Sequence, residues 1–196
     1  MHRYFIIHKP YNMLSQFTRE GNRTSLKDLY NFPSDVYPLG RLDADSEGLL
    51  VLTSDTQLNN LLLNPAFKHK RTYLVQVEGE LTDEALDILS GGITIYVKGK
   101  MHRTLPAIAE KVQQPGWLTE RNPPVRYRKS IPTSFLTLTL NEGKNHQVRK
   151  MTAATGFPTL RLIRIAIEQL QLEGLGPGEV KELGRTEIYR LLKVQL

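Results

Sequence analysis

The sequence predicts an α+β fold in which many short strands and a few helices form a mixed sheet around a cleft. Two observations support this prediction. Strand-like segments, either alternating or continuously apolar, recur from one end of the chain to the other. Helical segments are fewer, and most are bounded by a capping residue or by Gly or Pro. We expect residues 1–196 to form a single domain with room for two sublobes.

The first half of the chain contains three expected strands and two expected helices. A polar, glycine-containing stretch at residues 17–23 is expected to be a loop. Asp55 can cap a short helix over residues 56–63, and Thr82 can cap a second helix that ends at Gly91-Gly92. The expected strands are residues 4–7, 49–53 and 72–78.

The second half is dominated by strands and by one long irregular segment. Residues 113–132 contain proline, glycine and basic side chains without a period, which predicts a long loop or insertion. A helix is expected over residues 145–155, and residues 186–192 suggest a final short helix or strand. The expected strands are residues 105–112, 136–140 and the strand-rich stretch 163–172.

The composition is that of an ordinary globular protein. The chain has 196 residues, of which 40% are hydrophobic and 23% charged, and it has no cysteine. Disulfides, thiolate chemistry and cysteine-rich zinc sites are therefore excluded. There is no apolar run long enough for a membrane span and no apolar stretch typical of a signal peptide at the start. We expect a cytoplasmic protein that does not associate with membranes.

The chain is basic, with 26 Lys and Arg against 20 Asp and Glu, which gives a formal net charge of +6. Much of the excess is gathered in three clusters, two of them in loop-like sequence. Each cluster alone is equally typical of a solvated face, but three together favour a phosphate-binding surface. They are Lys98, Lys100, His102 and Arg103; Arg121, Arg126, Arg128 and Lys129; and Lys144, His146, Arg149 and Lys150, followed by Arg161 and Arg164.

The segment Pro38-Leu39-Gly40-Arg41-Leu42-Asp43-Ala44-Asp45-Ser46-Glu47-Gly48 places carboxylates directly before an apolar strand. Charges at such a position are either solvated turn residues or parts of a site. The same residues resemble the start of a calcium loop. That loop requires a bidentate glutamate at its twelfth position, where this chain has Ser54, so no metal site is predicted.

Two further segments combine polar and aromatic groups. Arg71-Thr72-Tyr73-Leu74-Val75 places a tyrosine in an expected strand, where packing in the core is the ordinary interpretation. Glu142-Gly143-Lys144-Asn145-His146-Gln147-Val148-Arg149-Lys150-Met151 would place His146, Arg149 and Lys150 on one helix face, which alone indicates a solvated basic stripe.

Taken together, the three segments resemble the motifs of the pseudouridine synthases, in particular the ribosomal RNA branch (RsuA type). The resemblance covers residues 4–183, and it is strongest in the first and third motifs. The second motif departs in one place, because Arg71 stands where the family usually has lysine. Relatives in this branch often carry an N-terminal S4 domain, which we do not expect here. The chain thus looks like the short E-type large-subunit rRNA pseudouridine synthases.

The resemblance implies a pseudouridine synthase fold, with a mixed, largely antiparallel sheet and flanking helices and loops around a central basic cleft. It implies that this single catalytic domain isomerises a uridine of ribosomal RNA, with no cofactor, and we expect a monomer. Asp43 is implied as the essential residue, Tyr73 as the group facing the uracil, and Arg149 as the partner of the aspartate. The expected RNA-binding residues are Arg41, Lys70, Arg71, Lys98, Lys100, Arg103, Arg126, Arg128, Lys129, His146, Gln147 and Lys150.

Three alternatives remain open. A non-catalytic RNA-binding or ribosome-associated factor explains the basic clusters, but leaves Asp43, buried among them, without a purpose. A synthase acting on tRNA would use the same motifs. A glycosidase could use Asp43 with Asp45 or Glu47 as its two carboxylates, although free sugars do not require three basic clusters.

Overall fold

The computed structural model describes residues 2–172 and 174–195, and these form a mixed α+β fold with a large, mostly antiparallel sheet. The fold class predicted from the sequence is confirmed. The chain divides into two compact units. Unit 1 consists of residues 1–69 and 163–196, and unit 2 consists of residues 70–162. Unit 2 is therefore a continuous segment inserted into the chain of unit 1.

Unit 1 is built on the strand order β13-β1-β5-β11. The strands are β13 (Val180–Leu183), β1 (Tyr4–Lys9), β5 (Glu47–Thr53) and β11 (Thr159–Ile167), which begins in unit 2. Neighbours are antiparallel except β5 and β11, which run parallel. The short strands β4 (Tyr37–Pro38) and β12 (Leu170–Gln171) pair with β5 and β11. All residues of β1 and β5 are buried, which explains why their sequences are nearly continuous apolar runs.

Two helices and a short strand pair complete unit 1. The helices are α1 (Thr56–Leu63) and α4 (Arg185–Leu191), and the parallel pair is β2 (Met13–Leu14) with β3 (Thr24–Ser25). Single 3-10 turns lie at Leu26–Asp28 and Pro65–Phe67. Asp55 caps α1 as predicted, because its carboxylate accepts hydrogen bonds from the N–H groups of Gln57 and Leu58. The same carboxylate accepts the hydroxyl groups of Tyr4 and Tyr189, each at 2.7 Å.

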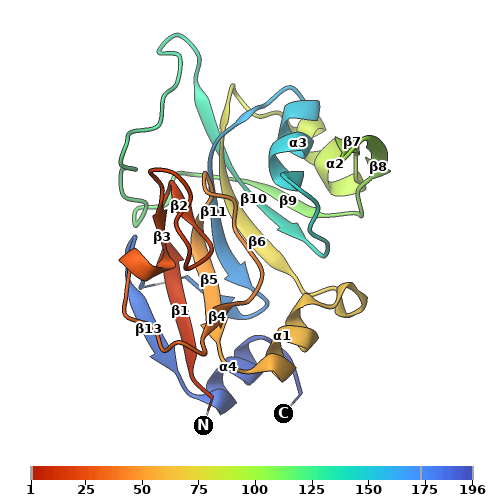
Figure 1. Cartoon of the computed structure of the whole chain (residues 1–196). Helices are drawn as coiled ribbons and strands as arrows, with labels where there is room; N and C mark the ends of the chain where they lie inside the picture. Colours follow the sequence, from red (N-terminus) through yellow and green to blue (C-terminus); the bar gives the residue numbers. More distant parts are fainter. Residues whose placement is uncertain (1, 173, 196) are drawn as a thin grey trace. The chain divides into compact units, whose positions relative to one another are not determined.

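Unit 2 contains the antiparallel strands β6 (Arg71–Glu78), β10 (Thr133–Leu140) and β9 (Ile108–Val112). The helices α2 (Asp83–Gly91) and α3 (Gln147–Ala154) pack on one face of these strands (Figure 1). Their side chains share one hydrophobic core, in which Leu89 of α2 and Met151 of α3 meet Val75 and Leu136 of the sheet. A small hairpin of β7 (Thr94–Val97) and β8 (Lys100–Arg103) lies outside this sheet.

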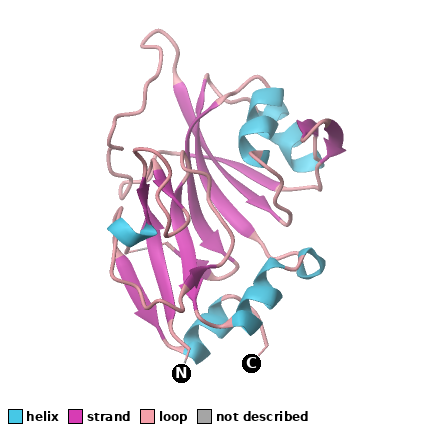
Figure 2. Cartoon of the chain, viewed as in Figure 1, coloured by secondary structure: helices cyan, strands magenta, loops and turns pink. Residues whose placement is uncertain are grey.

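Most of the elements expected from the sequence are present. The helices over 56–63 and 83–91 have the predicted caps, Asp55 and Thr82. All of residues 113–132 are described, and they form no helix or strand, as expected (Figure 2). The final segment proves to be a helix, α4.

Some boundaries and elements differ from the prediction. Strand β9 begins at Ile108 rather than at residue 105, since Pro106 has no N–H and that of Ala107 bonds to Ser90. The hairpin of β7 and β8 was not predicted. Its two-residue turn, Lys98-Gly99, has positive φ angles of 46° and 83°, a geometry for which the glycine was the available signal. The strands β2, β3, β4 and β13 were also missed.

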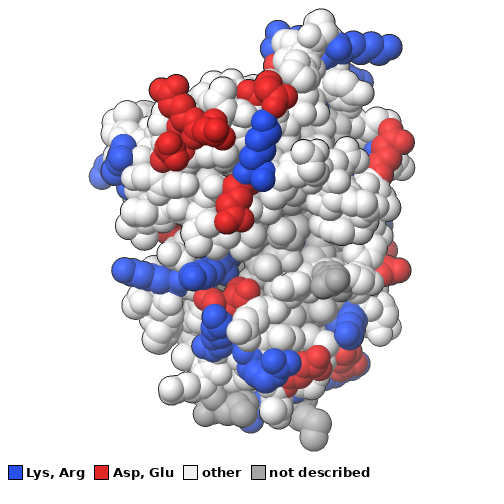
Figure 3. Space-filling view, turned by 180° about the vertical axis from the view of Figure 1, so that it is seen from behind, with Lys and Arg blue, Asp and Glu red and all other residues white. Residues whose placement is uncertain are grey.

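The distribution of surface charge and the character of the helices are relevant to binding of RNA and of membranes. Figure 3 shows one face of the molecule, on which acidic side chains are interspersed among the basic ones rather than excluded from a continuous basic field. Within the described residues, no helix combines the length and the apolar character needed to cross a membrane.

Candidate active site

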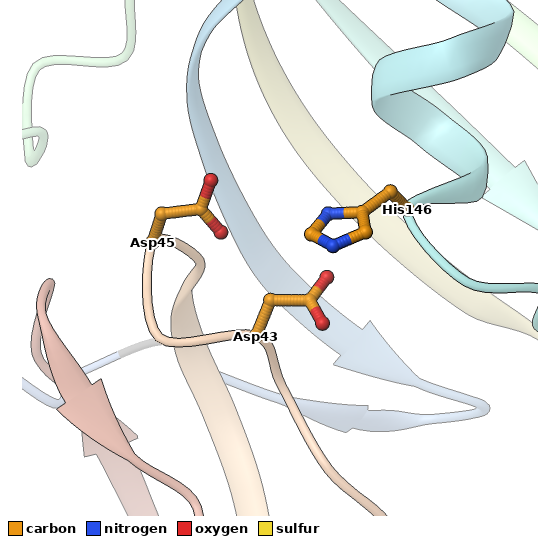
Figure 4. A group of neighbouring side chains, drawn as sticks. All are labelled: Asp43, Asp45 and His146. Carbon is orange, nitrogen blue, oxygen red and sulfur yellow. The ribbon is translucent and has the colours of Figure 1, made fainter. Parts of the chain in front are cut away.

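The first motif forms a tight turn that ends in β5. The N–H of Ser46 donates to the carbonyl of Asp43 at 3.0 Å, which closes the turn. Asp43 is exposed and Asp45 is half-buried, so the expectation that Asp43 is buried is wrong. Figure 4 shows the two carboxylates projecting from this turn. An exposed carboxylate on a short turn is available to an external substrate.

The chain near the N-terminus fixes this turn on both sides of Asp43. Ser15 accepts the N–H of Leu42 at 3.1 Å and donates its hydroxyl to the Leu42 carbonyl at 2.8 Å. On the other side, the N–H of Asn12 donates to the carbonyl of Ala44 at 2.7 Å. The backbone around the carboxylate is thus positioned by contacts with residues about thirty positions away in the sequence.

Lys9 is the central residue of this arrangement, and no motif in the sequence indicated it. Its side chain is fully buried, and its ammonium donates to the carbonyls of Pro10 at 2.9 Å, Met13 at 2.7 Å and Ala44 at 3.4 Å. Burial lowers the pKa of Lys9 to about 8, although the nearby carboxylates of Glu47 and Asp45 oppose this shift. A buried cation therefore lies directly beside the turn that carries Asp43.

The strand that follows the turn is held close to β11 by a glycine. Gly48 has φ of 105°, and a Cβ at this position would lie 2.3 Å from the carbonyl oxygen of Arg164. Only glycine permits this approach. The side chain of Arg164 is buried and donates to the carbonyl of Leu49 at 2.8 Å, so it does not belong to the basic surface proposed from the sequence.

Glu47 is also buried, with only 2% of its surface exposed, at the start of β5. A glycosidase that pairs Asp43 with Glu47 would need both carboxylates open to a sugar. The burial of Glu47 removes this pairing.

Tyr73 of the second motif lies on β6 in unit 2, opposite Leu138 of β10. Its ring is half-buried and packs against the hydrophobic core of this unit. The side chain thus has the packing role expected of a strand tyrosine, and it also keeps part of its surface accessible.

The third motif forms the turn before α3 rather than one helix face. His146 lies at the start of α3 (Figure 4), as its N-cap with φ of 51°. Its side chain is exposed. Arg149 and Lys150 lie in the first turn of the helix and are half-buried. The predicted common helical face of His146, Arg149 and Lys150 is therefore wrong, because His146 precedes the helix in a left-handed conformation.

A hydrogen-bond network fixes the turn of the third motif. One carboxylate oxygen of Glu142 accepts the N–H of Leu105 at 2.8 Å and the Gln147 amide at 2.9 Å. The other oxygen of Glu142 lies 3.1 Å from the His102 ring. Gln147 accepts the N–H of Lys144 at 2.9 Å in return. This network ties the motif to the segment that follows the small hairpin.

Gln147 was expected to bind RNA, and the structure gives it a different position. Only 4% of its surface is exposed, and its amide is bonded to Glu142 and Lys144 within unit 2. These interior contacts leave little of Gln147 available to RNA, so they do not support its assignment as an RNA-binding residue. Its bonds instead shape the turn that carries His146.

The other expected RNA-binding residues are mostly exposed. Arg128 forms a double hydrogen bond with Glu78, with the shorter distance at 2.6 Å, so its charge already has a partner. Arg71 is half-buried at the start of β6. The exposed residues are Arg41, Lys70, Lys98, Lys100, Arg103, Arg126, Arg128, Lys129 and His146.

Comparison with known proteins adds independent findings. A sequence family described as RNA pseudouridylate synthase matches residues 3–154. Ribosomal large subunit pseudouridine synthase E of Vibrio vulnificus is 49% identical over 91% of this chain and 74% of that protein. The protein of the same name from Xanthomonas axonopodis pv. citri is 44% identical, over 88% of this chain and 89% of its own. A crystal structure of a pseudouridylate synthase matches with a TM-score of 0.77 and 26% identity, over 97% of this chain and 74% of that chain.

Proposed function

The chain belongs to the RNA pseudouridylate synthase family, and we propose that it converts a specific uridine of large-subunit ribosomal RNA to pseudouridine. The main support for large-subunit ribosomal RNA as the substrate is the 49% identity, over 91% of the chain, to a ribosomal large subunit pseudouridine synthase E. The presence of all three motifs in order, with Asp43 exposed on a fixed turn, supports the same activity.

The reaction is an isomerisation that needs no external group. The bond between N1 of the uracil and C1′ of the ribose breaks, the ring turns, and C5 forms a new bond to C1′. The proton leaves C5, and N1 gains a proton. Neither oxidation nor transfer of a group from another molecule occurs, so residues of the chain can supply the whole chemistry.

We assign the reacting carboxylate to Asp43. A carboxylate can attack C1′ as a nucleophile or remove the proton at the neighbouring C2′ as a base. Both roles require an ionised, accessible group held in one position. The exposure of Asp43 and the hydrogen bonds on either side of it support this assignment.

We assign Tyr73 to the uracil ring and, as the resemblance implies, Arg149 to the role of partner of the reacting aspartate. The half-buried tyrosine can stack on a base, and its hydroxyl can accept the proton that leaves C5. A uridine within an RNA helix is not accessible, so the base must be flipped out before it can react. The enzyme is further proposed to act as a monomeric single catalytic domain in the cytoplasm.

The direct test is the pseudouridine content of ribosomal RNA from cells that lack the protein. One uridine of the large-subunit RNA should remain unmodified, and modification should return with the wild-type gene. Purified protein should also release tritium from C5-labelled transcripts of the large subunit, and not from small-subunit RNA or tRNA. Release from tRNA alone would contradict the proposed substrate while leaving the isomerase activity intact.

Asp43→Asn is the matched variant for this test, since it removes the ionisable group with almost no change in size. We expect tritium release to fall by a factor of about 10⁴ or more, while the affinity for RNA stays within about two-fold. Asp45→Asn, on the same turn, should retain much more activity. Comparable activity of Asp43→Asn and wild type would exclude Asp43 as the reacting group.

A further inference from the structure

We propose that a pocket beneath residues 113–132 binds an unstacked nucleotide of the RNA, separately from the uridine that reacts. We call it the loop pocket. It lies entirely within unit 2 and has a volume of about 550 Å³. The proposal rests on the proposed function, because it concerns how the RNA substrate is held. The residues that carry the argument are Gln76, Gln114, Arg121, Tyr127, Lys129 and Arg161.

The size of the loop pocket suits one nucleotide. Pockets for small ligands range from about 300 to 1,000 Å³, and a volume of 550 Å³ accommodates a base with its sugar and phosphate. A long irregular loop within a compact unit is also the usual place for a binding function. Size and location therefore favour a ligand over a packing defect.

The floor of the pocket is formed by strand residues with polar ends. Gln76 of β6 donates to the hydroxyl of Thr133 at 3.2 Å, which orients its amide. Arg161 of β11 is 95% buried, and its guanidinium donates to the carbonyl of Thr119 at 2.7 Å. This bond joins the floor to the loop. A guanidinium has five N–H donors in a fixed plane, so Arg161 can bind an acceptor-rich ligand in a defined orientation.

The wall of the pocket is supplied by the loop itself. Arg121 donates to the carbonyls of Pro123 at 2.8 Å and Pro124 at 3.2 Å, which holds the loop in its curved path. Tyr127 lines the pocket and has 56% of its surface exposed, so part of its ring is available to a ligand. Lys129 adds a positive charge at the same wall.

These groups match the parts of a nucleotide. The ring of Tyr127 offers a face on which a base can stack, and Lys129 and Arg161 offer charge for its phosphate. Glu120 also lines the pocket. Its carboxylate would disfavour a bare phosphate, but it can accept a hydrogen bond from the amino group of a base. The mixture of cations, amides, one carboxylate and an aromatic ring therefore favours a whole nucleotide over an inorganic anion.

The loop pocket is separate from the surface that Tyr73 offers. Tyr73, Val75 and Val77 alternate along β6 toward the hydrophobic core of unit 2. Gln76 lies between them in sequence, so its side chain points to the other face of the strand. The pocket thus serves the selection of RNA rather than the chemistry on the uracil.

The test compares matched variants in an Asp43→Asn background, where binding is measured without turnover. The probe is a large-subunit rRNA transcript fragment, and a second set of probes carries one abasic nucleotide at each position in turn. Tyr127→Ala should weaken binding of the intact probe about ten-fold, as expected for the loss of one stacked base. Tyr30→Ala removes another exposed tyrosine (46%), which lies in unit 1 and is not among the expected RNA-binding residues, and should change affinity by less than two-fold.

The abasic probes identify the nucleotide that binds in the loop pocket. At that position, the loss of the base and the loss of the Tyr127 ring should not reduce affinity additively, because each removes the same contact. One abasic position should cost about ten-fold with Tyr127 present and almost nothing with Tyr127→Ala. Arg161→Lys retains the charge but loses the planar fork, so it should weaken binding of the same probes by more than its loss of stability in urea unfolding accounts for. Trp117, the only tryptophan of the chain, lies in the same loop and reports the binding by fluorescence.

Two results would overturn the proposal. One is equal loss of affinity with Tyr127→Ala and Tyr30→Ala; the other is a set of abasic penalties that Tyr127→Ala leaves unchanged at every position. Failure of the proposed function would look different, because wild-type protein would then bind RNA without releasing tritium from it.

Discussion

Lys9 shows how a single residue can determine the geometry of the candidate site without reacting. A fully buried ammonium is costly, and here it is offset by three carbonyl groups, one of which belongs to Ala44, next to Asp43. We interpret Lys9 as a positioning residue. Its contribution can be separated from ordinary packing by its response to pH.

The lowered pKa of Lys9 determines whether the free energy of unfolding rises or falls with pH. The folded protein releases the proton near pH 8, while the unfolded chain retains it to about pH 10.5, so the unfolded state binds more protons in this window. The buried ammonium therefore destabilises the fold below pH 8, and this cost is relieved as the pH rises. From pH 8 to 10, the free energy of unfolding of the wild type should therefore rise by about 2 kcal/mol relative to that of Lys9→Met.

Urea unfolding at pH 7, 8.5 and 10 measures this shift. The same variant should lose at least ten-fold in tritium release at pH 7, because the turn of Asp43 loses a fixed contact. Lys181→Met, at an exposed position on β13, is the control for both measurements. A difference that stays flat over this pH range would show that Lys9 does not titrate as its burial implies.

Glu142 has a comparable role in the turn of the third motif. Its carboxylate accepts hydrogen bonds from Leu105 and Gln147 and contacts His102. Glu142→Ala should reduce activity about ten-fold and stability by about 1–3 kcal/mol, since the two donors lose their acceptor. Glu142→Gln retains one acceptor oxygen and should recover part of both losses. Equal activity of the Ala and Gln variants would argue against a positioning role.

At the scale of elements, the helix caps show how local signals determine unit 1 and unit 2. Asp55 caps α1 and Thr82 caps α2, each from the position expected of such a residue. Asp55 has a further task, because its carboxylate also joins Tyr4 of β1 to Tyr189 of α4. Burial by itself would raise the pKa of Asp55, but hydrogen bonds from both tyrosines and from the Leu58 N–H lower it overall.

The sign of the Asp55 contribution follows from its lowered pKa. The stabilisation is fully present above the ordinary pKa of an aspartate, about 4, and is lost as the pH falls through the lower folded value. Asp55→Asn should cost about 2–3 kcal/mol at pH 7, and the gap from wild type should narrow below pH 4. Thr82→Ala should cost about 1 kcal/mol at every pH, because a neutral cap does not titrate. Urea unfolding from pH 3 to 7 distinguishes the two.

At the scale of the whole molecule, the net charge of +6 is consistent with an RNA partner, but its distribution matters more. The cations of the small hairpin and of the 113–132 loop are exposed, whereas Arg164 and Lys9 are buried and cannot serve a phosphate in the same way. Counting charges in the sequence therefore overestimates the RNA-binding surface.

The salt dependence of RNA affinity tests which cations contact phosphate. Each lost phosphate contact should reduce the slope of log affinity against log salt by about 1. Arg126→Gln should show this reduction, while Arg128→Gln should show a smaller one, because Arg128 is already paired with Glu78. Filter binding of an rRNA transcript from 50 to 300 mM salt provides the slopes. If Arg128→Gln produced the larger reduction, the pair with Glu78 would have to open on the RNA.

The sequence alone determined the features that depend on neighbouring residues. Helix α1 begins after Asp55 because the cap and the N–H groups it satisfies lie within three positions. The alternation of β10 and the irregular composition of residues 113–132 are equally local signals. The motif around Asp43 could also be recognised from the sequence, because it consists of consecutive residues.

Which polar residues are exposed and which are buried could be read only from the folded chain. Lys9 reaches a carbonyl 35 positions away, and Arg164 reaches one 115 positions away. Gln147 is removed from the surface by Glu142 and by the core around Met151. A charged or amide group can be buried at low cost only when the fold brings hydrogen-bond partners from distant segments close to it. A local sequence pattern does not contain that information. For this reason the sequence pointed to Asp43, to which we assign the reaction, whereas the bonds by which Lys9 and Glu142 fix the turns of the two motifs became visible only in the folded chain.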